Sequence, residues 1–363
     1  MKLKDFFARF SSDTTAGSAN QRLCFLPDYE TRTGRVWYKL RSGGENYALL
    51  FSNIIDSTFA DGSESRANMI GEPWEILKVT LGICEGPKKA PEKTAAVTFG
   101  GCERRFVMGK DTFCSDPVYI GAKMGDWLCY EITFRGKTFP QQYERAISSA
   151  VVTDGEERDG QSFPFPLTVA NDRRTLRKIA FIGDSITQGL GTPTDAYRHY
   201  VGQIADRLPD PYSVWDLGIG YARGYDAATD RFWLERAKTC DTVNVCFGVN
   251  DISRGRTDKE VIADLEKILK ALKKAHCRTV LFTVPAFDFT GKKEEYFRSV
   301  NRAIREGKVG FADAVFDFSE CVAKPAPRDN EAAYGGHPNA DGCKAVAEAY
   351  VKSGIIDRIY LAR

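Results

Sequence analysis

A segment near the middle of the sequence places a serine where it could act as a nucleophile. Residues 183–187 (GDSIT) follow directly on the apolar run 179–182. In open parallel sheets, functional groups gather at the carboxyl ends of the strands. A serine on a strand-to-helix turn lies at a helix start, where backbone N–H groups have no helical partner. Ser185 therefore has the setting of an acyl-transfer nucleophile.

Such a nucleophile needs a general base, and the chain has three histidines. His337 stands just before the final helical pattern of the sequence, so it can reach the same edge of a sheet. His199 falls inside a helical pattern over 197–208, and His276 falls at a helix end. His337 is therefore the predicted base.

The developing oxyanion needs several donors. Gly220 and Tyr221 follow the strand pattern around 214–215, and either could offer a backbone N–H. Asn250 follows the next strand pattern and offers a side-chain amide. Together with the N–H of Ser185, these groups form the predicted oxyanion hole. Each motif is common alone, and it is their order along the chain that favours a common site.

The four motifs together resemble those of the SGNH, or GDSL, ester hydrolases. The matching segments are 183–187 (GDSIT), 218–220 (GIG), 248–251 (GVND) and 337–342 (HPNADG), in the family's order within 178–350. The resemblance implies a flavodoxin-like three-layer domain, with Ser185 as nucleophile and His337 as general base and then acid. It also implies that Asp184 shapes the turn rather than reacts. The first half also resembles the β-domain that precedes the catalytic domain in some bacterial members, through 50–53, 98–101 and 115–117.

The sequence departs from the family pattern at two positions. Family members usually carry Asp three residues before the histidine, whereas this chain has Tyr334. Three explanations stay open: a Ser–His dyad oriented by a backbone carbonyl, a carboxylate from Asp329 or Glu331, or a slow or inactive enzyme. Tyr221 stands where the family often has glycine. A backbone donor there tolerates any side chain while φ stays negative, but the tyrosine narrows the pocket.

The elements that must position these residues fall into two halves. The first half shows period-two alternation in short runs separated by Gly, Pro, Asn and Asp, with expected strands near 35–40, 46–51, 77–81, 95–99, 104–108, 117–121 and 128–134. Such runs predict an antiparallel β-sandwich, jelly-roll-like. We expect this domain, with a leading tail, over 1–160, and a polar linker over 161–177.

The second half, 178–363, alternates short apolar runs with helical patterns. The runs lie at 179–182, 243–247, 279–284 and 314–318. Thr257-x-x-Glu260 is a capping box at the start of the clearest helix. Alternating strands and helices predict an α/β domain with a parallel sheet covered on both faces.

Composition narrows the functional classes. The net charge of +2 gives no electrostatic reason to bind nucleic acid or a membrane. No apolar run is long enough for a membrane span or a secretion signal, so we expect a cytoplasmic chain. The ten cysteines include no Cys-x-x-Cys pair, which favours reduced, mostly buried thiols. Dinucleotide-binding, phosphate-binding and zinc motifs are missing, so no cofactor and no metal are expected.

These observations predict a serine ester hydrolase that removes a short acyl group through an acyl-enzyme, with O-acetyl groups on a small-molecule or oligosaccharide ester as the preferred substrate. Two alternatives remain within the class, a general short-chain carboxylesterase and a lysophospholipase-type lipase. Outside it, a catalytically weak protein could bind carbohydrate on aromatics such as Trp37, Tyr38, Trp74 or Trp127, although their spacing favours core packing. The sequence leaves homo-oligomer formation open.

Overall fold

The structure is a computed structural model that describes residues 3–17, 19–56, 70–141, 146–160, 162–209, 212–229, 231–322 and 336–361. The chain divides into two compact units. The N-terminal unit comprises Met1–Leu176 with the short segments Thr194–Tyr197 and Ser213–Trp215, and the C-terminal unit comprises Arg177–Pro193, Arg198–Tyr212 and Asp216–Arg363.

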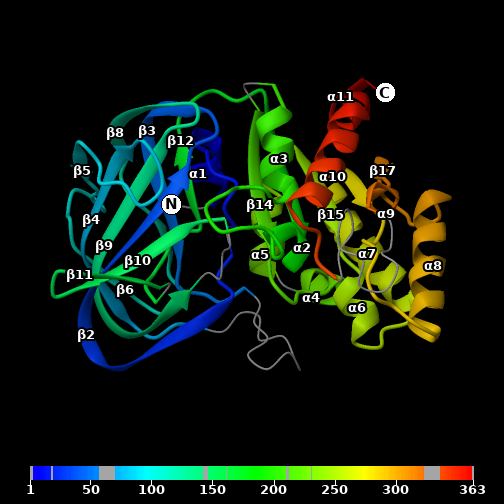
Figure 1. The fold of residues 1–363 in the computed structure, drawn as a ribbon, viewed down its shortest axis with the longest axis horizontal. Coiled ribbons are helices and arrows are strands. Elements are labelled where there is room, and N and C mark those ends of the chain that lie inside the picture. The colour runs from blue at the N-terminus through cyan, green and yellow to red at the C-terminus, as the bar shows by residue number, and fades with distance from the viewer. Residues whose placement is uncertain are drawn as a thin grey trace. The chain divides into compact units, whose positions relative to one another are not determined.

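Two antiparallel sheets build the N-terminal unit, after the short helix α1 (Leu3–Arg9) (Figure 1). The first has the order β1 (Ser11–Ser12), β12 (Thr168–Asn171), β3 (Gly43–Ser52) and β7 (Thr112–Cys114), with β8 (Val118–Lys123) also paired to β3. The second has the order β11 (Glu156–Asp159), β10 (Ser148–Thr153), β2 (Arg22–Lys39), β9 (Trp127–Gln141), β4 (Trp74–Cys84) and β5 (Thr94–Ala96), with β6 (Arg105–Val107) also paired to β4.

The period-two alternation of the sequence decides which face of these strands is buried. In β4, Val79 and Leu81 lie in the core while Lys78 beside them is exposed. The same core holds residues of both sheets, Leu49 and Tyr130 among them, so the predicted sandwich is present. The jelly-roll form of its connections stays a prediction. The four aromatic residues considered for carbohydrate binding pack in the core, as their spacing in the sequence predicted. Trp37, Tyr38 and Trp74 are buried, and Trp127 is half-buried.

The segment 161–177 differs from the linker that its polar composition predicted. Residues 168–171 form β12, which pairs with β3 on one side and β1 on the other. All four residues of this strand are buried. The apolar residues Val169 and Ala170 allow this segment to form a buried strand, although its overall composition is typical of a connection. The boundary between the two units falls after Leu176.

A parallel sheet forms the centre of the C-terminal unit. Its order is β14 (Tyr212–Gly218), β13 (Arg177–Gly183), β15 (Thr242–Cys246), β16 (Arg278–Phe282) and β17 (Ala314–Phe316). The pairings of β13 with β15, β15 with β16 and β16 with β17 are parallel. This 2-1-3-4-5 order is the flavodoxin-like arrangement that the family resemblance implied, and its switch point lies beside the first strand, β13.

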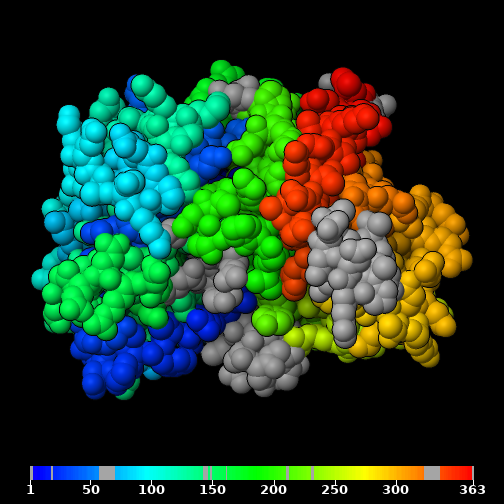
Figure 2. All heavy atoms as spheres, viewed as in Figure 1, coloured from blue at the N-terminus to red at the C-terminus, as the bar shows by residue number. Residues whose placement is uncertain are grey.

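The helices of this unit are α2 (Ser185–Gln188), α3 (Tyr200–Arg207), α4 (Gly224–Thr229), α5 (Arg231–Ala237), α6 (Val249–Ser253), α7 (Asp258–Lys274), α8 (Lys292–Arg305), α9 (Phe318–Cys321), α10 (Ala340–Lys352) and α11 (Ile355–Leu361). Most of the contacts between them fall into two groups: α3 packs on α10, and α7 packs on α4 and α8. Figure 2 shows α3, in green, beside α10, in red, at the surface. None of the helices in the described part of the chain is long and apolar enough to cross a membrane.

The helix α7 begins as its sequence predicted. The hydroxyl of Thr257 accepts a bond from the N–H of Glu260, and the Glu260 carboxylate accepts one from the N–H of Thr257.

All ten cysteines lie among the described residues and are free thiols, as expected, and six of them are buried.

Candidate active site

Ser185 is held on a tight turn between β13 and the four-residue helix α2. Asp184 caps this helix, because its Oδ1 accepts a bond of 2.9 Å from the N–H of Ile186. Gly189 ends it with φ +100°, and the Gly189 N–H returns to the carbonyls of Ser185 and Ile186. The carboxylate thus shapes the turn, the part expected of it. The N–H of Ser185, at the first helical position, donates no hydrogen bond to any described residue.

The predicted base reaches this serine across 152 positions of the sequence. The Oγ of Ser185 lies 2.8 Å from Nε2 of His337, which is hydrogen-bonding distance. His337 precedes α10, whose N-cap Asn339 accepts bonds from the N–H groups of Asp341 and Gly342. The serine is 9% exposed and the histidine half-buried. The structure therefore brings together the two residues that proton transfer requires.

Burial lowers the pKa of His337 below its ordinary value of 6.5. The ring is therefore neutral at neutral pH, and its Nε2 can accept the serine proton. The imidazole and the ring of Phe287 form a T-shaped pair, with ring centroids 5.9 Å apart. Within the described ranges, no residue bonds the second ring nitrogen of His337. Asp329 and Glu331, the predicted third members, and Tyr334 lie outside the described residues.

The turn after β14 carries the predicted backbone donors. The Ile219 N–H donates to Gly183 O at 3.0 Å, which ties this turn to the end of β13. The N–H of Gly220 makes no hydrogen bond within the part of the chain that the structure describes, so it can bind an oxyanion. Tyr221 has φ +65°, against the expectation of a negative angle, and its side chain is 50% exposed. A tyrosine in this left-handed region carries backbone strain, which is typical of functional sites.

Asn250 lies between the serine turn and the Gly220 turn. It follows Gly248, whose φ of +125° starts α6 directly after β15. Its Nδ2 donates to Ala222 O at 3.1 Å and to Asp184 Oδ2 at 3.4 Å. The second bond is long and therefore weak. The amide is next to the site, but an oxyanion would have to replace its bond to Asp184.

Two buried carboxyl groups lie behind these donors. Burial raises the pKa of Asp184 to about 7, and the charge of Asp251 adds to this effect. Burial also raises the pKa of Asp251 to about 6. Asp251 accepts bonds from the N–H groups of Gly224 at 2.8 Å and Tyr225 at 3.3 Å, so it fixes the segment that follows Tyr221. Asp251 is not among the predicted site residues, although its place next to Asn250 in the GVND motif was a signal.

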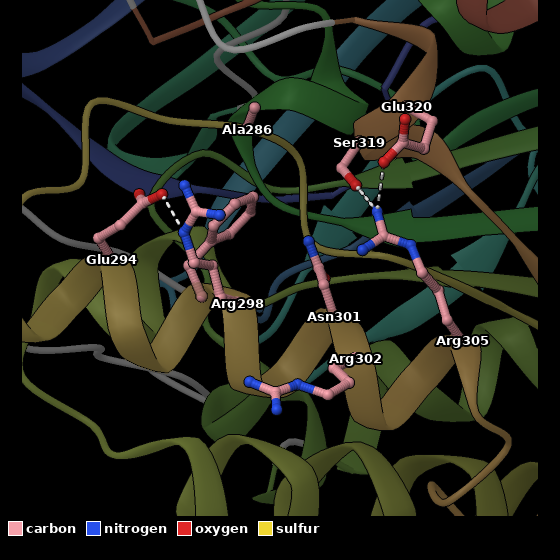
Figure 3. A pocket seen from close by; sticks show the side chains of 9 residues that line it. Ala286, Glu294, Arg298, Asn301, Arg302, Arg305, Ser319 and Glu320 are labelled. Atoms are coloured by element: carbon pink, nitrogen blue, oxygen red, sulfur yellow. Dashed lines mark hydrogen bonds and ion pairs between the residues drawn. The ribbon is translucent and has the colours of Figure 1, made fainter.

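A hollow of the C-terminal unit lies along α8, and its volume is about 380 Å³. Figure 3 shows Arg298 turned to Glu294, and Arg305 turned to Ser319 and Glu320. The positive charges of Arg298 and Arg305 are therefore paired with carboxylates of the protein itself. Among the described residues that line this hollow there is no histidine or cysteine.

The described residues contain no group of three or more His, Cys, Asp or Glu side chains arranged to hold a metal ion. The arrangement at Ser185 provides a nucleophile, a base and backbone donors, the parts that acyl transfer uses.

Comparison with known proteins bears on the same segment. Residues 181–345 match the model of the GDSL-like Lipase/Acylhydrolase family. A comparison with curated proteins found no match.

Three solved structures are similar to the chain at low identity. A lipolytic protein of the G-D-S-L family from Veillonella parvula DSM 2008 is 21% identical, covers 48% of this chain and 96% of its own, and has a TM-score of 0.40. A family two carbohydrate esterase from Cellvibrio japonicus is 13% identical, covers 97% and 95%, and has a TM-score of 0.40. The psychrotrophic esterase EstA from Pseudoalteromonas sp. is 16% identical, covers 51% and 99%, and has a TM-score of 0.41. The family match at 181–345 is the finding that bears on function.

Proposed function

We propose that the chain is a carboxylic ester hydrolase that cleaves esters through an acyl-enzyme on Ser185, in line with the match of residues 181–345 to the GDSL-like Lipase/Acylhydrolase family. The observation that carries this proposal is the 2.8 Å contact between Ser185 Oγ and His337 Nε2. A serine hydroxyl is a weak nucleophile at its free pKa and becomes a strong one when a neighbouring base takes its proton.

The reaction follows from this contact. As Ser185 Oγ attacks the ester carbonyl carbon, its proton passes to Nε2 of His337. The carbonyl oxygen becomes negative and accepts bonds from the N–H groups of Ser185 and Gly220. His337 then returns the proton to the leaving alcohol. In the second half of the reaction, which hydrolyses the acyl-enzyme, His337 takes a proton from a water molecule as the water oxygen attacks the acyl carbon. His337 then returns this proton to Ser185 Oγ, which leaves as a free hydroxyl.

Asn250 is the proposed third donor to the oxyanion. Its Nδ2 bond to Asp184 is 3.4 Å long, and the charged oxyanion is a stronger acceptor than a carboxyl group that is protonated below pH 7. The exchange of one acceptor for the other costs little in the ground state, so this donor acts mainly in the transition state.

The substrate we propose is a short acyl ester, with O-acetyl groups on a carbohydrate as first choice. Tyr221 directly follows the proposed oxyanion donor Gly220, and we propose that its bulk limits the space for a long acyl chain. In the segment after Tyr221, the guanidinium of Arg223 lies 5.1 Å from the ring centroid of Tyr225, and that of Arg256 lies 4.7 Å from the same centroid. Asp226 pairs with Arg223, and Asp264 pairs with Arg256. We propose that this segment, whose two arginines are paired with carboxylates, faces the leaving group, and polar and aromatic groups suit a hydroxyl-bearing leaving group better than a lipid.

The test is hydrolysis of p-nitrophenyl acetate, p-nitrophenyl palmitate and an acetylated xylo-oligosaccharide by the full chain. We expect turnover of the two acetyl esters and its loss in Ser185→Ala. Ser253→Ala, which removes a serine hydroxyl on α6, serves as the matched control and keeps full activity. Turnover that survives Ser185→Ala would contradict the nucleophile, and a preference for palmitate would contradict the short acyl group.

A further inference from the structure

A buried histidine–aspartate pair lies next to the nucleophile turn and has no place in the mechanism above. The Nε2 of His199 is 3.4 Å from Oδ2 of Asp216. Both residues are fully buried, at 0% exposure. Polar and charged groups are costly to bury unless they bond to one another or to the backbone. The sequence predicted His199 inside a helix, whereas it is the N-cap of α3, with extended φ and ψ of −65° and 157°.

The histidine supports the nucleophile turn. A Cβ atom built on Gly189, the residue that ends α2, would lie only 2.7 Å from Cβ of His199. The backbone of the turn therefore rests directly on this side chain. The next residue adds a second contact, because the hydroxyls of Tyr200 and Thr187 are 2.9 Å apart. The start of α3 thus holds the serine turn at two points.

The aspartate supports the oxyanion turn. Its Oδ1 accepts a bond of 2.7 Å from the N–H of Gly218, two residues before the donor Gly220. Gly218 itself is pressed onto α2, since a Cβ there would lie 2.3 Å from the backbone nitrogen of Gln188. One carboxylate therefore connects the Gly220 turn to His199, and through His199 to the serine turn.

We propose that His199 and Asp216 form a positioning pair that fixes the Gly220 donor relative to Ser185. The inference rests on the function proposed above. The pair acts through the backbone of Gly189 and Gly218 and not on the substrate. Donors to an oxyanion work because they are fixed before the reaction, and a misplacement of about 1 Å can cost about 100-fold in rate.

Variants of both residues test this role through the split between kcat and KM. We expect His199→Ala to lower kcat by about 10- to 100-fold and to change KM by less than about threefold, because the lost interaction belongs to the transition state. His199→Gln carries an amide nitrogen at about the reach of Nε2 and restores most of the lost kcat. Asp216→Asn keeps an acceptor for the Gly218 N–H and nearly the same volume, so it folds even where His199→Ala does not. It loses the carboxylate oxygen that faces His199, and its kcat falls about 10-fold.

A destabilised variant elsewhere in the same unit is the control. Tyr350→Phe removes a buried bond of 2.7 Å to Asn244 Oδ1, so its Tm falls while kcat is retained. If His199→Ala and Asp216→Asn keep kcat within about twofold while Ser185→Ala is inactive, the positioning pair is overturned and the proposed function stands. A wild type that turns over no ester overturns both. Loss of kcat without rescue by His199→Gln also overturns the pair.

Discussion

Replacing Asp184 by asparagine removes a buried charge and keeps the cap on α2. The side-chain oxygen of asparagine can accept the Ile186 N–H as the carboxylate does at 2.9 Å. Asp184 is 2% exposed, and burial, followed by the charge of Asp251, raises its pKa to about 7 from an ordinary value of 3.8. The folded protein therefore holds this group in its neutral form through a range in which the unfolded chain ionises it.

The sign and size of the effect follow from linkage. Because the folded pKa lies above the unfolded one, the stability associated with this group is complete below about pH 4 and is lost as the pH rises through about 7. One pKa unit corresponds to about 1.4 kcal/mol, so the whole shift corresponds to about 4 kcal/mol, of which about 3 kcal/mol falls between pH 5 and pH 8. An asparagine at this position does not titrate and contributes no such pH dependence.

The assay is urea unfolding of both full-length proteins at pH 5, 6, 7 and 8. All other titrating groups are common to the two proteins, so the difference in their unfolding free energies isolates this one group. We expect Asp184→Asn to become more stable relative to wild type by about 3 kcal/mol from pH 5 to pH 8. A difference that stays constant with pH would refute the reasoning, since Asp184 would then be ionised in the fold throughout, held so by the Asn250 amide.

Four further predictions concern the site and one helix. The acid limb of kcat/KM has its midpoint below pH 6.5, because His337 must be neutral and burial lowers its pKa; a midpoint above 6.5 in a pH–rate profile contradicts this. Asn250→Ala lowers kcat about 10²- to 10³-fold with little change in KM, and full kcat in steady-state kinetics removes it from the oxyanion hole. Gly191→Ala lowers kcat, because a Cβ there would lie 2.9 Å from Cβ of His337 at φ +100°; unchanged kinetics contradict that contact. Thr257→Ala costs about 1 kcal/mol of stability in urea unfolding, with activity retained.

Much of the site could be predicted because local sequence controls local structure. The turn at 183–187 joins a strand to a helix and needs a residue that caps the helix. Asp184 caps it through its own side chain, which is a local interaction that the sequence alone can predict. The capping box at Thr257 and Glu260 is equally local and is present. In the second part of β4, after the bulge between Ile76 and Lys78, the alternation of Val79 and Leu81 with polar neighbours fixed the buried face.

Other features depend on contacts that no local pattern reports. His199 lies in a sequence with helical periodicity, yet packing against Gly189 makes it the residue before the helix, where it faces Asp216. The φ of +65° at Tyr221 is imposed by a turn fastened to Gly183 and Asn250, and tyrosine by itself would not adopt it.

The sequence by itself determined which residue types stand at the ends of the strands, and therefore that a serine, an imidazole and donors are available for acyl transfer. Only the tertiary structure decided that Ser185 Oγ and His337 Nε2, from residues 152 positions apart, lie 2.8 Å from each other. It also decided that the Asn250 amide donates to Asp184 and Ala222. The physical reason is that strand and turn preferences act over a few residues, whereas distances between segments follow from how the parallel sheet and its helices pack.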